Sequence, residues 1–256
     1  MTSASSTVEL AVDGSVAVVR LNRPQRLNAV VPELVDDLLA ALRTAGADEE
    51  VRAIVLAGRG RAFCAGHDLK EPPAEGDSRT RLEQLQDVTR CLRGLRQPVI
   101  AAVHGYAIGA GAEFALGCDL VLAAEDAVFA FPEAGLGLSV TGAASRLLPL
   151  LVGPLKAKRL LLLGERIDAT TAAELGLVNE VLPGDALLEQ ALAWAHTVAE
   201  HPPSSVALAK RALDAGIDSS LETALELEVS HALITEHSAE VAESSARFRS
   251  RSGADR

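Results

Sequence analysis

Two glutamates in the middle of the chain are the residues whose types and spacing best suit acid–base chemistry. Glu113 follows an apolar run at 99–103 and three glycines between residues 105 and 111, a pattern that predicts a strand, a tight turn and the start of a helix. Glu133 comes after a strand–turn–strand pattern at 119–131, which can carry the chain out and back. This path can bring Glu133 back near Glu113, and a pair of carboxylates suits general acid–base work, in which one takes a proton and the other gives one. Each glutamate alone would more often be a solvated surface residue.

The glycine-rich turn before Glu113 can supply a second kind of catalytic group. Small residues let a ligand approach the backbone closely. The first N–H groups of a helix have no partner within it and carry the positive end of its dipole. Such donors can hold a negative charge that develops on an oxygen atom. The same residues would also fit an ordinary strand–helix turn in which Glu113 only complements the dipole.

Strand-like and helix-like stretches alternate over the first two thirds of the chain, and helices alone fill the last third. The predicted strands are Val8–Val12, Val16–Leu21, Ala53–Ala57, the run from Val99, Asp119–Ala124 and Val128–Phe131. The predicted helices begin at Pro32, Ser78, Gly111, Pro154 and Thr171, the last with a Thr171–Glu174 capping box, and three apolar helical stripes follow from about Asp185. Residues 71–77 are expected to form a loop, and the tail beyond Arg247 is expected to fray.

Composition limits the kinds of partner. A chain of 256 residues with 48% hydrophobic content can bury one full core. Its net charge of −11 argues against nucleic acid or an anionic membrane as the main partner. Met1–Thr7 is polar, and no apolar run approaches the roughly 20 residues that span a bilayer. Three cysteines without metal-ligand spacing are typical of reduced thiols, which indicates a cytoplasmic protein with no metal site.

Six segments together give the chain a resemblance to a known family. They are Arg23–Ala29, Phe63–Leu69, Val103–Glu113, Gly117–Asp119, Phe131–Glu133 and Ala173–Val178. In this order they resemble the crotonase superfamily, the enoyl-CoA hydratases and isomerases. The resemblance implies an α/β fold, with a spiral of repeated ββα units and the acyl-CoA site in residues 1–195. It also implies a helical trimerisation region in residues 196–256, and a homotrimer or a hexamer formed as a dimer of trimers.

The resemblance also implies the site residues and the reaction. Glu113 and Glu133 would share the acid–base work, and the backbone N–H groups of His67 and Ala110 would hold the thioester oxygen. The implied CoA and substrate-binding residues are Arg26, Leu27, Ala29, Ala65, Gly66, Asp68, Leu69 and Gly109. The implied activity is the reversible hydration of a trans-2-enoyl-CoA, with CoA as part of the substrate and no separate cofactor. Isomerase relatives usually keep only the second glutamate, so Glu113 favours a hydratase, with an isomerase or another acyl-CoA dehydratase as the alternative.

The chain departs from the family pattern at several positions. Ala110 stands where many relatives have glycine, and His67 stands where a small residue is commoner. Residues 139–144 replace a glycine-richer run that shapes the acyl pocket in the family. The resemblance therefore does not extend to the identity of the substrate's acyl group. A serine hydrolase built on Ser139 would lack the second glycine of a nucleophile elbow. A non-catalytic acyl-CoA-binding oligomer would have no need of both glutamates.

Overall fold

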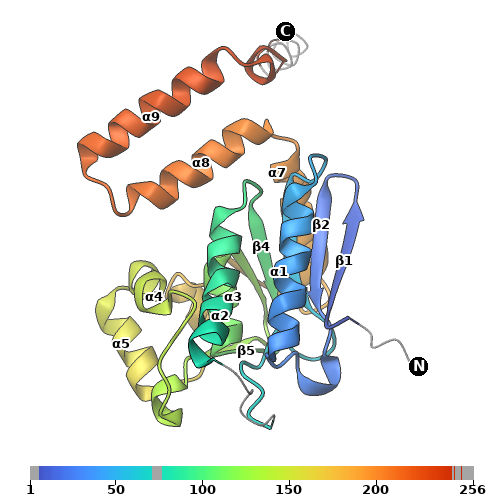
Figure 1. Cartoon of the computed structure of the whole chain (residues 1–256), viewed down its shortest axis with the longest axis vertical. Helices are drawn as coiled ribbons and strands as arrows, with labels where there is room; N and C mark the ends of the chain where they lie inside the picture. Colours follow the sequence, from blue (N-terminus) through green and yellow to red (C-terminus); the bar gives the residue numbers. More distant parts are fainter. Residues whose placement is uncertain (1–5, 71–76, 244, 246–248, 250–256) are drawn as a thin grey trace.

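The computed structural model describes residues 6–70, 77–243, 245 and 249, and in this part of the chain six strands form the central sheet in the order β1-β2-β3-β4-β6-β9 (Figure 1). The strands are β1 (Val8–Asp13), β2 (Val16–Leu21), β3 (Ala53–Gly58), β4 (Val99–Val103), β6 (Leu120–Ala124) and β9 (Glu180–Leu182). The first two form an antiparallel hairpin, and the later pairings are parallel. Most of residues 71–77 and most of the tail beyond Arg247 lie outside the described residues, so the expectations for them stay untested.

Helices cover both faces of this sheet. Figure 1 shows α1 (Pro32–Ala47), α2 (Ser78–Gly94) and α3 (Ala110–Gly117) on one side, and α7 (Leu187–Ala199) packs on the other. Side chains of β3 alternate between the two cores: Ile54 packs on the side of α1, and Val55 on the side of α7. Strands that are buried on both faces have continuous apolar sequences. The sequences of β3 and β4 are apolar runs of this kind.

A second, smaller sheet lies next to the glycine-rich turn. Its strands are β5 (Tyr106–Ile108), β7 (Val128–Ala130) and β8 (Ile167–Asp168), in the order β5-β7-β8. The parallel pairing of β5 with β7 sets Ile108 opposite Ala130, and Gly109 N–H continues it by donating to Ala130 O at 2.9 Å. The start of α3 is thereby tied to the segment that leads to Glu133.

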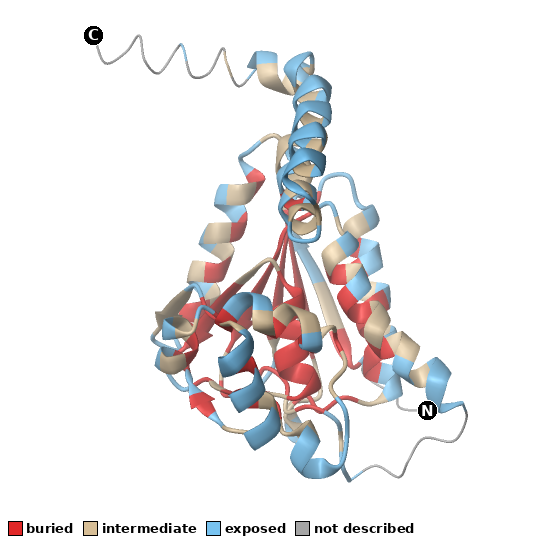
Figure 2. Cartoon of the chain, turned by 90° about the vertical axis from the view of Figure 1, so that its left-hand side faces the viewer, coloured by how far each residue is buried: buried red, intermediate tan, exposed pale blue. Residues whose placement is uncertain are grey.

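The remaining helices are shorter or lie further from the sheet. They are η1 (Pro24–Arg26), η2 (Glu133–Leu136), α4 (Ala144–Val152), α5 (Pro154–Leu163), α6 (Ala169–Glu174), α8 (Pro203–Gly216) and α9 (Leu221–Glu236). In Figures 1 and 2, α8 and α9 extend away from the body of the molecule, and α9 buries no residue. In the part of the chain that the structure describes, no helix is long and apolar enough to cross a membrane.

Three sequence-based expectations need correction. The helix at residue 169 begins earlier than predicted, because Asp168 rather than Thr171 is its N-cap and accepts from Thr171 N–H at 2.8 Å. Helix α3 begins at Ala110, one residue before the predicted start. The short strands β5, β8 and β9 and the helix α4 were not predicted, because two or three residues carry too little periodicity, and α4 contains Pro149.

Candidate active site

Glu113 lies on the first turn of α3 with its side chain inside the protein. The helix starts there because Gly109 adopts φ 53° and ψ −121°, a conformation suited to glycine, and its carbonyl accepts from Glu113 N–H at 2.9 Å. Glu113 is only 1% exposed. Its carboxylate accepts two hydrogen bonds from Thr141, from the backbone N–H at 2.6 Å and from the hydroxyl at 2.5 Å. Burial raises the pKa of Glu113 and the charge of Glu133 adds to the rise, although the bonds from Thr141 oppose it.

Glu133 approaches the same turn from the other side. It begins η2, which two residues separate from β7, and the pairing of β7 with β5 brings it beside Gly109. A Cβ atom added to Gly109 would lie 2.7 Å from Glu133 Oε1. Glu133 Oε2 is buried and has no hydrogen-bond partner among the described residues. Burial raises the pKa of this carboxyl above its ordinary value. The structure thus brings the two glutamates together around the turn at Gly109.

The turns that carry His67 and Ala110 lie side by side. Cys64 pairs with Ala107 in a parallel bridge, and its carbonyl accepts from Ile108 N–H at 3.0 Å. This pairing sets residues 64–67 along the strand that leads into α3. Ala110 is the first residue of α3, so its N–H has no acceptor within the helix. Two backbone donors from adjacent turns can therefore face one substrate oxygen, next to both carboxylates.

The His67 side chain is exposed, and its environment disfavours a charged imidazole. Burial of part of the ring and the positive charge of Arg81 lower the pKa of His67 below its ordinary value. A neutral imidazole is therefore expected at pH 7. The backbone of His67 pairs with Val30 in a second parallel bridge, which holds the turn independently of the ring.

Among the predicted CoA-binding residues, Arg26 and Asp68 bind each other. Arg26 donates to both oxygens of Asp68, from Nε at 3.1 Å and from Nη2 at 3.0 Å. Arg23 forms a third contact with Asp68 at 3.4 Å. Burial opposes the ionised carboxyl, but the hydrogen bonds from Lys70 N–H and Arg26 and the charges of both arginines hold the pKa of Asp68 below its usual range. One carboxylate is thus shared by two arginines, so this cluster of three charged side chains keeps a net positive charge.

These contacts join the two segments that were predicted to bind CoA. Ala65 N–H donates to Leu27 O at 3.0 Å, and Val30 N–H donates to Gly66 O at 2.8 Å. Ala29 is buried, and Leu69 is 69% exposed. Backbone hydrogen bonds and the Arg26–Asp68 ion pair therefore hold residues 26–29 against residues 65–69.

Two positions at the site went unpredicted. Thr141 lies in the segment that departs from the family pattern. The sequence feature that could have identified it as a site residue is a hydroxyl side chain among small residues. Asn28 is buried, and its side-chain amide donates to Arg59 O and Ala62 O while its oxygen accepts from Arg23 N–H. The amide ties the loop before α1 to the loop after β3. Within the described ranges, no group of three or more His, Cys, Asp or Glu residues could hold a metal ion.

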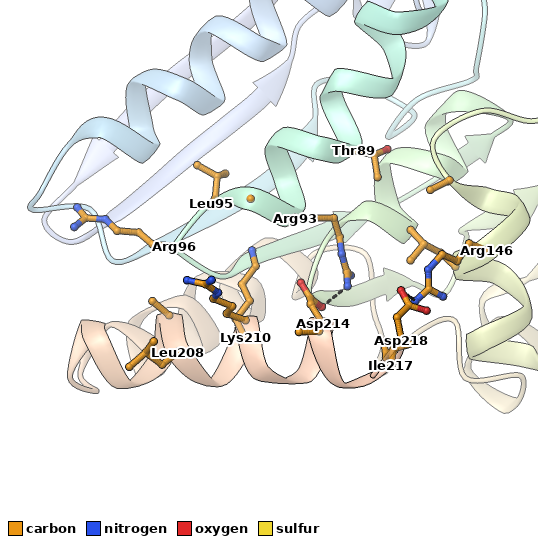
Figure 3. Close-up of a pocket in the computed structure, with 16 residues that line it drawn as sticks. Thr89, Arg93, Leu95, Arg96, Arg146, Leu208, Lys210, Asp214, Ile217 and Asp218 are labelled. Carbon is orange, nitrogen blue, oxygen red and sulfur yellow. Dashed lines mark hydrogen bonds and ion pairs between the residues drawn. The ribbon is translucent and has the colours of Figure 1, made fainter. Parts of the chain in front are cut away.

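A cavity of about 810 Å³ lies between α2, α4 and α8 (Figure 3). Two charged residues on α8, and a third just after its end, form ion pairs with the body of the protein at this cavity. Lys210 pairs with Asp119, Asp214 with Arg93, and Asp218 with Arg146. Lys210 is buried and also donates to Leu92 O and Gln97 O. These contacts fix α8 against α2 and α4, and neither glutamate lines the cavity.

Comparisons of both sequence and structure with known proteins find similarity to enoyl-CoA hydratases. A model of the enoyl-CoA hydratase/isomerase family matches residues 11–254. The chain is 37% identical over 210 residues to the 2,3-dehydroadipyl-CoA hydratase of Escherichia coli K12, covering 82% of each protein. It is 35% identical over 226 residues to the short-chain-enoyl-CoA hydratase of Clostridium acetobutylicum, covering 87% of each. The crystal structure of the enoyl-CoA hydratase from Bacillus anthracis is similar with a TM-score of 0.92 at 33% identity, covering 96% of each chain.

Proposed function

The chain belongs to the enoyl-CoA hydratase/isomerase family and has its α/β crotonase fold, and from its site we propose that it adds water reversibly to a trans-2-enoyl-CoA thioester to give a 3-hydroxyacyl-CoA. Relatives at similar identity are named for different acyl groups, a dehydroadipyl and a short-chain group. The proposal therefore stops at the 2-enoyl-CoA class. CoA is part of the substrate, and no further cofactor is needed.

The observation that carries this proposal is a pair of carboxylates with unlike surroundings, one buried (Glu113) and one half-buried (Glu133). Glu113 accepts two hydrogen bonds from Thr141, which favour its ionised form. Glu133 Oε2 accepts none within the described protein, so its protonated form is favoured by comparison. Glu113 is therefore the better base and Glu133 the better acid. Burying the Glu113 carboxyl and half-burying that of Glu133 costs free energy, and a protein that only binds acyl-CoA would gain nothing from this cost.

The geometry supports the following step. The N–H groups of His67 and Ala110 bind the thioester oxygen. Glu113 removes a proton from water while the water oxygen bonds to C3, and the electron pair of the C2–C3 double bond moves toward the thioester as an enolate. Glu133 then gives its proton to C2. Protons exchange with solvent to restore the glutamates, and the net change is the addition of one water. A single hydrogen-bond donor to an oxyanion is worth about 3–4 kcal/mol of barrier where a side-chain donor has been removed.

The assembly and location are part of the same proposal. Helices α8 and α9 expose a set of large apolar side chains, namely Leu213, Leu221, Leu225, Val229, Leu233 and Ile234. Apolar faces of this kind favour burial in an oligomer, and we propose a homotrimer, or a hexamer of two trimers, held together through the C-terminal helical region. All three cysteines are free, which favours a reducing compartment. We propose the cytoplasm, although some relatives are named mitochondrial enzymes.

Replacing each glutamate by glutamine tests the mechanism. Glu113→Gln and Glu133→Gln should each lower kcat by about 100-fold or more, since each removes general acid or base catalysis. Glu125→Gln, at an exposed position between β6 and β7, is the matched control and should turn over like the unchanged protein. The assay follows loss of the conjugated thioester and identifies the product by mass. Turnover that needs Glu133 alone and adds no water would instead indicate a double-bond isomerase, and normal turnover in either variant would remove that glutamate from the mechanism.

A further inference from the structure

Thr141 holds both oxygens of the Glu113 carboxylate. Its backbone N–H donates to Oε1 at 2.6 Å, and its hydroxyl donates to Oε2 at 2.5 Å. A single residue therefore fixes the plane of the carboxylate as well as its position. Thr141 does so from the segment between η2 and α4, whereas Glu113 lies on α3.

The backbone around Thr141 is shaped for these two contacts. Gly142 has a φ of +54°, and a Cβ atom there would lie 2.6 Å from Glu113 Cβ, so the chain passes hard against the glutamate. Ala143 is also left-handed, with φ 59°, and Ala144 N–H donates to Thr141 O at 2.9 Å. A left-handed alanine persists where surrounding contacts over-determine it, as at functional sites. The resulting turn directs both donors of Thr141 at Glu113.

We propose that Thr141 is a positioning residue, whose hydroxyl and N–H orient the Glu113 carboxylate for removal of a proton from water. The proposal rests on the hydration proposed above, because that reaction makes Glu113 the base. The two donors have different properties. The N–H can only donate, so it favours the carboxylate, whereas the hydroxyl can donate to the carboxylate or turn to accept from the protonated acid. The hydroxyl therefore suits Glu113 in both protonation states of the cycle.

The surroundings of Glu113 disfavour its ionised form, whereas the two donors of Thr141 favour it. Burial raises the pKa of Glu113, and so does the negative charge of Glu133 on η2. The other elements packed on α3 are α2, β5 and α4, and among the described residues they add no further charged group that acts on Glu113. The bonds from Thr141 are what lowers its pKa. Loss of the hydroxyl should therefore shift Glu113 further toward its protonated form.

Three variants separate the hydroxyl from its surroundings. Thr141→Val keeps the shape of the side chain and removes the hydroxyl, while Thr141→Ser keeps the hydroxyl and removes the methyl group. Ser145→Ala removes an exposed hydroxyl from α4 and is the control. Steady-state hydration by Thr141→Val should show kcat lowered by about 10- to 100-fold, the usual worth of a hydrogen bond to a charged group. KM should stay nearly unchanged, and the Ser and control variants should keep most of the activity.

A second measurement tests the contact between Thr141 and Glu113 and does not depend on turnover. Infrared spectra taken over a pH series show the C=O stretch of protonated carboxyl groups, and Glu113→Gln identifies the band that belongs to Glu113. The midpoint of this band should rise by about one pH unit or more in Thr141→Val and stay near the original in Thr141→Ser. Should the valine variant fail to fold by circular dichroism, Thr141→Ala takes its place, because alanine also lacks the hydroxyl.

The outcomes are distinct for the two proposals. A normal kcat and midpoint in Thr141→Val would overturn the role of Thr141, and so would a serine variant as impaired as the valine variant. Absence of hydration by the unchanged protein would overturn the proposed function. In that case the pH midpoint of the Glu113 carboxyl band still tests the contact with Thr141. A higher midpoint in Thr141→Val would support Thr141 as the residue that controls the protonation of Glu113, and an unchanged midpoint would overturn that role.

Discussion

Replacement of Gly109 by alanine tests whether the turn before α3 positions the site. Gly109 has φ 53° and ψ −121°, a region that costs a residue with a side chain about 1–3 kcal/mol. The new Cβ would also lie 2.7 Å from Glu133 Oε1, where ordinary contacts begin at 3.4 Å. The carboxylate must then retreat by about 0.7 Å, and a misplacement of order 1 Å can cost about 100-fold in rate.

We therefore expect Gly109→Ala to lose about 100-fold in kcat and to lower the melting temperature by about 2–4 °C for each kcal/mol of strain. Hydration of an enoyl-CoA and calorimetric unfolding measure the two effects. Gly135→Ala is the matched control, because it lies two residues after Glu133 and a Cβ there has nothing within 4 Å. A Gly109→Ala protein with the original kcat would refute the placement of Glu133 against this turn.

Four further predictions follow. His67→Ala should keep most of the activity, because the proposed donor is the backbone N–H; a folded variant that binds CoA without turnover would give the imidazole a chemical role. Activity should fall as the pH drops through the pKa of Glu113, which burial raises, so the acid limb of kcat/KM should lie above the ordinary glutamate range. Because the pKa of Glu133 is also raised, the folded state binds that proton more tightly than the unfolded state, and stability falls as the pH rises through this window. Glu133→Gln should accordingly raise the melting temperature at neutral pH, and the gain should vanish in acid. Light scattering at micromolar concentration should give three or six times the chain mass of 26.7 kDa, and a monomer mass would contradict the proposed trimer.

Local patterns in the sequence were enough to predict much of the framework. Apolar runs marked the central strands because both faces of the sheet are covered, so burial needs no alternation. Pro32 and Ser78 marked where two long helices begin, since start signals act within one turn. The glycines at 105–111 marked a tight turn. The family resemblance added the two glutamates and the two backbone donors, whose roles stay proposals.

The tertiary structure decided which side chains meet at the site. Glu133 reaches Glu113 because β5 pairs with β7, and that register depends on residues distant in the chain. Thr141 binds Glu113 because left-handed residues at 142–143 turn the backbone back onto α3. The family resemblance implied Arg26 and Asp68 as CoA-binding residues, but their mutual pairing depends on how two separate loops dock. Periodicity and turn residues act over a few positions, so the sequence by itself determined the elements, whereas contacts and charges between elements depend on the packing that only the folded chain provides.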